Sequence, residues 1–324
     1  MKEITFIRNN IEKWQATEEL LEDISSVNPD ELADTYVDLT TDLSFAQTHY
    51  PKSRITIYLN NLASSLHNNL YKNKQEKWSR LITFWTHEVP LTMYDNRNLL
   101  RVSMLLFVIS FVIGIVSQLL NPEFCRIILS DAYVDMTLEN IEKGVPMGIY
   151  GSKDELPMFL GITINNVGVS FQMFAKGLLT SIAVGISIFN NSIMLGCFET
   201  LFYQHGLLGE SLLTVFQHGT LEISALIISG AAGLAMGNGW LFPGTYSRLV
   251  SFQRGAKRGL KIIVGLVPVF ICAGFIEGFV TRHTETPNAI RVMVIILSLI
   301  FIIGYFIVLP YVRHKQLIQK ENDN

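Results

Sequence analysis

QHGTLEISALIISGAAGLAMGNG, residues 217–239, carries the most informative pattern in this chain. It is apolar over a length that suits a bilayer, yet it begins with His218 and Glu222, which lie four residues apart and so share one face of a helix. Small side chains continue that face, while isoleucine and leucine occupy the opposite one. A carboxylate in a membrane helix costs roughly 2.5–3.5 kcal/mol on insertion scales. We therefore expect a transmembrane helix whose Glu222 faces neighbouring helices and not lipid.

The composition of the whole chain favours an integral membrane protein. Its 324 residues are 49% hydrophobic and only 16% charged, and the mean hydropathy is +0.32. That balance is too apolar for a soluble protein of this length. The net charge of −3 gives no reason to expect binding to nucleic acid. The first ten residues lack the apolar core of a secretory signal peptide, so we expect the N-terminus to stay in the cytoplasm.

Residues 1–98 read as a soluble helical domain in the cytoplasm. Apolar side chains recur there at helical spacing, and no strand-like alternation is visible. The main apolar positions are Leu32, Tyr36, Leu39, Leu43, Ile55, Leu59, Leu62, Leu66, Trp78, Leu81, Phe84 and Trp85. We predict an all-α protein, in which this domain is followed by a transmembrane helix bundle over residues 99–315 and a polar tail over residues 316–324.

About six membrane crossings are expected in this bundle. The first, residues 100–120, has roughly the 20 apolar residues that a bilayer requires. An acidic connection, residues 121–157, follows and suits the outside of the cell. The fourth, fifth and sixth crossings are expected near residues 216–241, 262–280 and 289–312. The segment 246–261 has five lysines and arginines and no acid, which predicts an inner-membrane protein with both termini in the cytoplasm.

The second and third crossings, within residues 158–206, admit two interpretations. Polar residues interrupt this region at Asn165-Asn166 and at Asn190-Asn191, and the short apolar runs 177–189 and 192–203 are each too short to cross about 30 Å. One interpretation is an amphipathic second span that begins at Met158, followed by a third span over residues 192–205. The other is a re-entrant hairpin of the kind that marks binding sites in transporters. We favour the first, and both return the chain to the outside.

Several motifs are shared with a known family. They include YVDLTTDLSFA at residues 36–46, YP at residues 50–51 and HGTLEI at residues 218–223. With these segments the chain resembles the stage II sporulation protein M family, a widespread prokaryotic membrane family, over nearly its whole length. The long N-terminal domain resembles the non-sporulation branch. The resemblance implies a membrane scaffold that recruits or regulates envelope-remodelling partners, such as peptidoglycan-degrading proteins.

The titratable residues of the predicted spans gather near the outer leaflet. His218 and Glu222 lie in the fourth span, Glu277 in the fifth, and Glu199 and His205 in the third. One interpretation is a hydrated cavity that binds a cation, a proton, a lipid headgroup or the polar side chain of a partner. The other is mutual pairing, for example of Glu222 with His218, that only joins helices. An ion, proton or small-solute transporter or channel that uses these residues is the alternative function.

Motifs for catalysis or metal binding are not evident in the sequence. It contains no HExxH, no GxSxG and no GxxxxGK[ST] motif. His218 and Glu222 supply two potential ligands, too few for zinc without help from elsewhere. We therefore expect no enzyme, no cofactor and no metal, and we rank an intramembrane hydrolase last.

Two pairs of glycines at GxxxG spacing, Gly233 with Gly237 and Gly274 with Gly278, permit close helix approach. They suit packing within the chain or a contact in a homo-oligomer.

Overall fold

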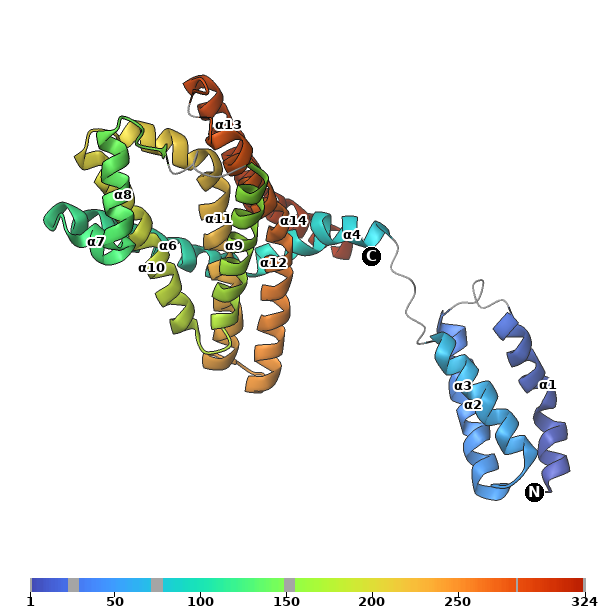
Figure 1. The fold of residues 1–324 in the computed structure, drawn as a ribbon. Helices are drawn as coiled ribbons and strands as arrows, with labels where there is room; N and C mark the ends of the chain where they lie inside the picture. Colours follow the sequence, from blue (N-terminus) through green and yellow to red (C-terminus); the bar gives the residue numbers. More distant parts are fainter. Residues whose placement is uncertain (1, 23–28, 71–77, 149–154, 284, 323–324) are drawn as a thin grey trace. The chain divides into compact units, whose positions relative to one another are not determined.

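The computed structural model describes residues 2–22, 29–70, 78–148, 155–283 and 285–322. Within these ranges every regular element is a helix and no strand is present, which confirms the all-α fold class (Figure 1). The chain divides into two compact units, Met1–Ser79 and Arg80–Asn324. Each unit is described by itself.

The first unit contains α1 (Glu3–Glu22), α2 (Pro29–His49) and α3 (Arg54–Leu70). The apolar stripes predicted from the sequence meet in its core, where Trp14, Leu39, Leu59 and Leu66 are almost fully buried. Trp14 Nε1 donates a hydrogen bond of 2.9 Å to Asp42 Oδ2, so the indole is satisfied where it is buried.

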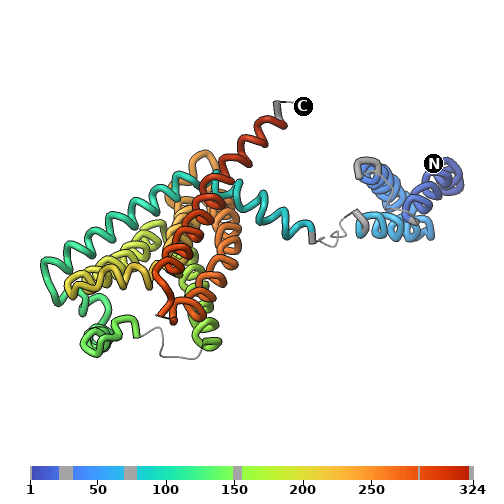
Figure 2. Tube along the Cα trace, turned by 90° about the horizontal axis from the view of Figure 1, so that it is seen from above, coloured from blue at the N-terminus to red at the C-terminus, as the bar shows by residue number. Residues whose placement is uncertain are grey.

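The second unit begins within α4 (Trp78–Thr83) and holds the membrane helices. Six helical segments are long and apolar enough to cross a bilayer: Arg97–Leu120, Glu155–Lys176, Ser181–Gln204, Leu208–Leu241, Arg248–Thr281 and Asn288–Lys320. Their elements are α6 (Arg97–Leu120), α9 (Glu155–Lys176), α10 (Ser181–Gln204), α11 (Leu208–Leu241), α12 (Arg248–Ile276) with the π-helical turn η4 (Glu277–Thr281), and α13 (Asn288–Ile303) with η5 (Gly304–Val308) and α14 (Leu309–Asn322). Two short helices, α7 (Phe124–Leu129) and α8 (Asp131–Glu142), follow α6 and lie beside its end (Figure 2).

Residues 80–98 pack on the membrane helices, although the sequence analysis placed them in the N-terminal domain. They form the end of α4, the turn η2 (Phe84–Glu88) and α5 (Val89–Asp95). Glu88 pairs with Lys261 of α12 at 2.6 Å, and Tyr305 donates a hydrogen bond of 2.6 Å to the carbonyl of Trp85. The hydrogen bond from Lys261 lowers the pKa of Glu88. An apolar stripe fits a soluble core and a membrane bundle equally well, so the sequence did not distinguish the two.

Two complete helices, α9 and α10, occupy the region for which the sequence left two interpretations open. The structure agrees with two separate spans, but α10 begins at Ser181 and not at residue 192. It continues through Asn190-Asn191 because the Asn191 side chain donates to the carbonyl of Ser187 in its own helix, at 2.8 Å. An asparagine satisfied in this way needs no break in the helix. At the other end of the unit, the predicted polar tail is helical as far as Asn322.

The most deeply buried span is α11, which contacts α6, α9, α10, α12 and α13. Glycines allow the close approach. A Cβ added at Gly233 would lie 2.8 Å from the carbonyl oxygen of Met173, and one at Gly237 would lie 2.8 Å from Cα of Ser181. The predicted pair Gly274 and Gly278 faces Thr163 and Phe159 of α9. In this chain both pairs therefore serve intrachain packing, and the reason is the backbone distance and not side-chain chemistry.

Gly196→Ala and Gly185→Ala, both in α10, form a matched pair of tests. A Cβ at Gly196 would meet the backbone carbonyl of Phe111, whereas one at Gly185 meets nothing within 4 Å. We expect Gly196→Ala to lower the free energy of unfolding by about 1–3 kcal/mol. Gly185→Ala should leave it unchanged or raise it by up to about 1 kcal/mol. Thermal unfolding in detergent measures both, and an equal effect of the two variants would contradict the packing described here.

Candidate functional site

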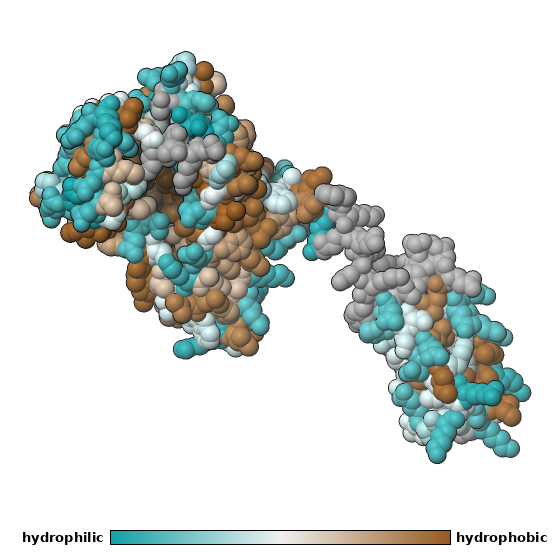
Figure 3. Space-filling model, in the orientation of Figure 1, coloured by the Kyte–Doolittle hydropathy of each residue, from teal (hydrophilic) through white to brown (hydrophobic). Residues whose placement is uncertain are grey.

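A cavity of about 940 Å³ lies between α9 and α10, with α11 at its back. We call it the α9–α10 cleft. Asn166 and Val169 of α9 stand on one side, and Met194 and Phe198 of α10 on the other. The surface of the bundle is hollowed at this place (Figure 3). Apolar side chains that flank it on the outside, such as Ile164, are exposed as expected for residues that meet lipid.

The cleft is closed at the end where residues 177–180 join α9 to α10, which we call the turn end. There Gly177 fits against the carbonyl of Gly233, and Lys176 Nζ donates to Ser187 Oγ at 2.5 Å. Of the lining residues on α9 and α11, Met173 and Ser229 lie farthest along their helices toward this end. The cleft is therefore blind at the turn end, because the same glycines that bring α9 and α10 onto α11 remove the space between them.

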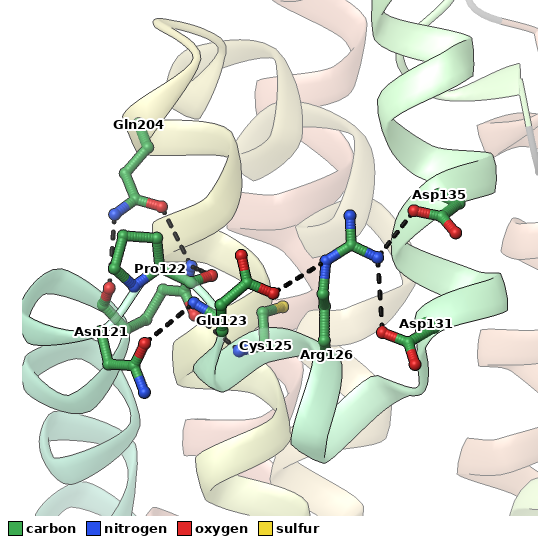
Figure 4. A network of polar contacts seen from close by, with 9 residues as sticks. Asn121, Pro122, Glu123, Cys125, Arg126, Asp131, Asp135 and Gln204 are labelled. Carbon is green, nitrogen blue, oxygen red and sulfur yellow. Dashed lines mark hydrogen bonds and ion pairs between the residues drawn. The ribbon is translucent and has the colours of Figure 1, made fainter.

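The opposite end is covered by α7 and α8, which we call the roof. Leu129 of α7 and Tyr133 of α8 line the cleft from this side. Arg126 holds the roof together, because its guanidinium pairs with Glu123 at 3.2 Å, Asp131 at 3.4 Å and Asp135 at 2.6 Å (Figure 4). Asp135 is the largest cause of the raised pKa of Arg126.

Amide contacts join the roof to the membrane helices. Gln118 of α6 accepts a hydrogen bond of 2.7 Å from the backbone N–H of Cys125 and donates one of 3.0 Å to Gln204 of α10. Gln118 is fully buried, whereas Gln204 is exposed at the end of its helix. Gln118 therefore links the roof to α6 and α10.

Three titratable side chains meet at the back of the cleft: His218 and Glu222 of α11, and Glu277, the first residue of η4. We call them the polar cluster. One potential ligand atom from each lies within 4.8 Å of the others. His218 Nε2 and Glu277 Oε2 are 3.8 Å apart, and His218 is only 4% exposed. Glu222 is partly exposed, and the space it faces is the cleft.

Two neighbours orient the cluster. Thr281 Oγ1 lies 3.1 Å from His218 Nδ1, so the other ring nitrogen is the one on the side of Glu277. Asn166 Nδ2 donates a hydrogen bond to Glu222 Oε1. Asn166 was visible in the sequence as a polar interruption of an apolar helix, whereas nothing in the sequence marked Thr281. The π-helical turn brings Thr281 and Glu277 to the same side, and such turns are frequent at functional sites.

The other two residues that the sequence placed in the cluster, Glu199 and His205, lie elsewhere. Neither lines the cleft. Glu199 of α10 is 4% exposed, and its carboxylate oxygens have no hydrogen-bond partner among the described residues. His205 is exposed at the end of α10, where its Nδ1 lies 2.8 Å from the carbonyl of Leu201. The sequence predicted how deep both residues lie in the membrane. It did not predict how α10 is rotated about its axis, which decides which of its side chains face the cleft.

The negative charge of the polar cluster is not balanced by a basic side chain among the described residues that line the cleft. Two carboxylates lie in a mostly apolar cavity, and in the described part of the chain no lysine or arginine lines it. Carboxylates this close repel each other unless a proton or a cation lies between them. The arrangement is therefore suited to hold a positive charge at the back of the cleft.

Comparisons with known proteins were made for both units. A family model described as stage II sporulation protein M matches residues 103–282, more than half of the chain. A second model, a domain of unknown function, matches residues 4–72. An uncharacterised protein of Methanocaldococcus jannaschii is 27% identical over 157 residues, which are 45% of this chain and 67% of that protein. No solved structure matches the chain.

Thr281→Val tests the support of His218. The substitution keeps the side-chain shape but removes the hydroxyl, so His218 Nδ1 loses a buried hydrogen bond, and we expect a loss of about 1–3 kcal/mol in the free energy of unfolding. Thr200→Val is the control, because its buried hydroxyl bonds only to the carbonyl of Gly196 in its own helix, at 2.8 Å. Unfolding in detergent compares the two, and a smaller loss for Thr281→Val than for the control would refute this role.

Proposed function

The chain belongs to the stage II sporulation protein M family, and we propose that this member binds a membrane-derived ligand in the α9–α10 cleft and acts as a scaffold for envelope-remodelling partners. One observation carries the proposal: the cleft has apolar walls and, at its back, a polar cluster whose two carboxylates favour a positive charge beside them. Such a combination suits a ligand with an apolar body, whose binding is completed by a positive charge at Glu222 and Glu277.

The position of the cleft supports a ligand from the membrane. The cleft lies along the apolar lengths of α9 and α10, both of which are long enough to span the bilayer. Its walls include Val169, Met194 and Phe198, which offer apolar contact but no charge. A polar solute from water would gain little from such walls, whereas an acyl chain or the apolar side of a partner's helix would gain the hydrophobic contact.

The blind turn end supports binding over transport. A channel or transporter needs a route to both sides, yet α9, α11 and α12 are in backbone contact below Met173. A Cβ at Gly259 would lie 2.6 Å from the carbonyl of Ala232, and one at Gly233 would lie 2.8 Å from that of Met173. To open this end, helices that now touch through glycines would have to separate. We therefore favour a scaffold without transport or catalysis.

We also propose that the protein lies in the inner membrane with both termini in the cytoplasm. The basic segment 246–261 supports this orientation, because it begins in the connection between α11 and α12 at the turn end, forms the first turns of α12 and carries no acid. The roof then faces outward, toward the envelope, and the N-terminal unit is cytoplasmic.

A cysteine at Thr245, in a Cys272→Ser background, tests the orientation. We expect a membrane-impermeant maleimide to label it only after the cells are permeabilised, while a cysteine at Glu142 in α8 is labelled in intact cells. Both positions are exposed. Labelling of residue 245 in intact cells would reverse the orientation.

Gly161→Trp tests the cleft. Gly161 lines it, and a Cβ there meets nothing within 4 Å, so an indole should enter the cleft without disturbing the helices. We expect the ligand that co-purifies from membranes, measured by mass spectrometry, to fall at least about tenfold, which corresponds to about 1.4 kcal/mol. Recovery of envelope proteins in a pulldown should fall with it.

Gly168→Trp is the matched control. Gly168 lies on the same helix, is equally open and does not line the cleft. It should retain both ligand and partners. If Gly161→Trp binds as much ligand as the control and the wild type, the cleft is not the binding site.

A further inference from the structure

We propose that His218, Glu222 and Glu277 bind a divalent transition-metal ion, best matched by Zn²⁺, at the back of the α9–α10 cleft. The inference rests on the proposed function in one respect, namely that this end of the cleft takes a positive charge. It assigns that charge to a metal ion held by the protein and leaves the apolar walls for the ligand. The local His218-x-x-x-Glu222 motif offers only two potential ligands, and the fold brings the third, Glu277, within reach of them.

The donor atoms are close to the spacing that a metal requires. Zinc binds histidine nitrogen and carboxylate oxygen at about 2.0–2.2 Å, so two donors of a tetrahedral site lie roughly 3.4 Å apart. His218 Nε2 and Glu277 Oε2 are 3.8 Å apart, and all three ligand atoms lie within 4.8 Å of one another. Side-chain rotation of the two glutamates is sufficient to close the remaining distance, because both are less constrained than the buried imidazole.

Neighbouring side chains orient the proposed metal ligands through hydrogen bonds, as such neighbours do in known metal sites. A metal-binding histidine donates its second ring N–H to an oxygen, which fixes the tautomer. Thr281 Oγ1 lies 3.1 Å from His218 Nδ1, and in the tautomer whose Nδ1–H donates to that hydroxyl the Nε2 lone pair is on the side of Glu277. Asn166 Nδ2 donates to Glu222 Oε1, which fixes one oxygen of that carboxylate. The three ligands and their two supports come from α9, α11 and η4, so the cluster is held from three directions.

Charge and donor type select the metal. Two carboxylates and a neutral imidazole carry two negative charges, which a divalent cation cancels in a cavity whose described lining holds no lysine or arginine. An imidazole donor suits zinc and related transition metals, whereas calcium and magnesium require six or more oxygen ligands. Three protein ligands leave one position of a tetrahedral ion open. That position faces the cleft, where the polar group of the ligand would coordinate.

Metal binding by the purified full-length protein tests the proposal. We would strip the protein in detergent with a chelator, add ZnCl2, remove the excess and measure bound zinc by mass spectrometry of the elements. We expect about one zinc ion per wild-type chain, as for a single three-ligand site, and a higher unfolding temperature with zinc than without. Glu277→Gln and Glu222→Gln should each weaken zinc binding by at least about tenfold and abolish the thermal shift.

Glu199→Gln is the matched control, because Glu199 is also a buried membrane glutamate but lies outside the cluster. It should bind zinc as the wild type does. No bound zinc in the wild type, or equal loss in Glu199→Gln and Glu277→Gln, would overturn the metal site. The proposed function would stand in that case if Gly161→Trp still lost its ligand. Zinc binding by a wild-type protein that carries no ligand would instead overturn the proposed function alone.

Discussion

Close backbone contact around α11 governs the arrangement of the membrane unit. Gly177, just after α9, and glycines on α10, α11 and α12 let main chains approach to distances at which a Cβ would not fit, as at Gly233 and Gly259. In a membrane the lipid is as apolar as a leucine side chain, so helices associate through such packing and not through the hydrophobic effect. The contacts of Gly177, Gly233, Gly237 and Gly259 lie toward the turn end. Toward the roof α9 and α10 are separated by the cleft.

The cleft places two carboxylates where their burial is costly. Glu222 and Glu277 lie beside an almost fully buried His218, and Asn166 supplies one hydrogen-bond donor. An unpaired buried charge is strongly destabilising, so the two carboxylates favour a compensating positive charge beside them. Glu199 is also buried, on α10, but it does not line the cleft. The polar cluster therefore differs from an ordinary buried acid in having both companions and access.

The roof and the N-terminal unit give the protein surfaces outside the membrane helices. Arg126 collects three acids around α7 and α8, and Gln118 ties this group to α10. Tyr133 of the roof also lines the cleft. A ligand in the cleft and a partner bound to the roof would therefore both lie against α8. This is the arrangement that the proposed scaffold would use to relate its ligand to a partner.

Patterns within single segments were sufficient to predict much of the molecule. Apolar length predicted about six spans, helical spacing predicted the core positions of α2 and α3, and the four-residue interval of His218 and Glu222 placed both on one face of α11. The sequence grouped Glu277, Glu199 and His205 with these residues on predicted depth in the membrane alone, so it could not show which of the three lie beside His218 and Glu222. Nor could it show that residues 80–98 pack on the bundle. These depend on how each helix is rotated about its axis and on which neighbour it touches. Both are set by contacts between segments far apart in the chain, such as that of Gly233 with Met173.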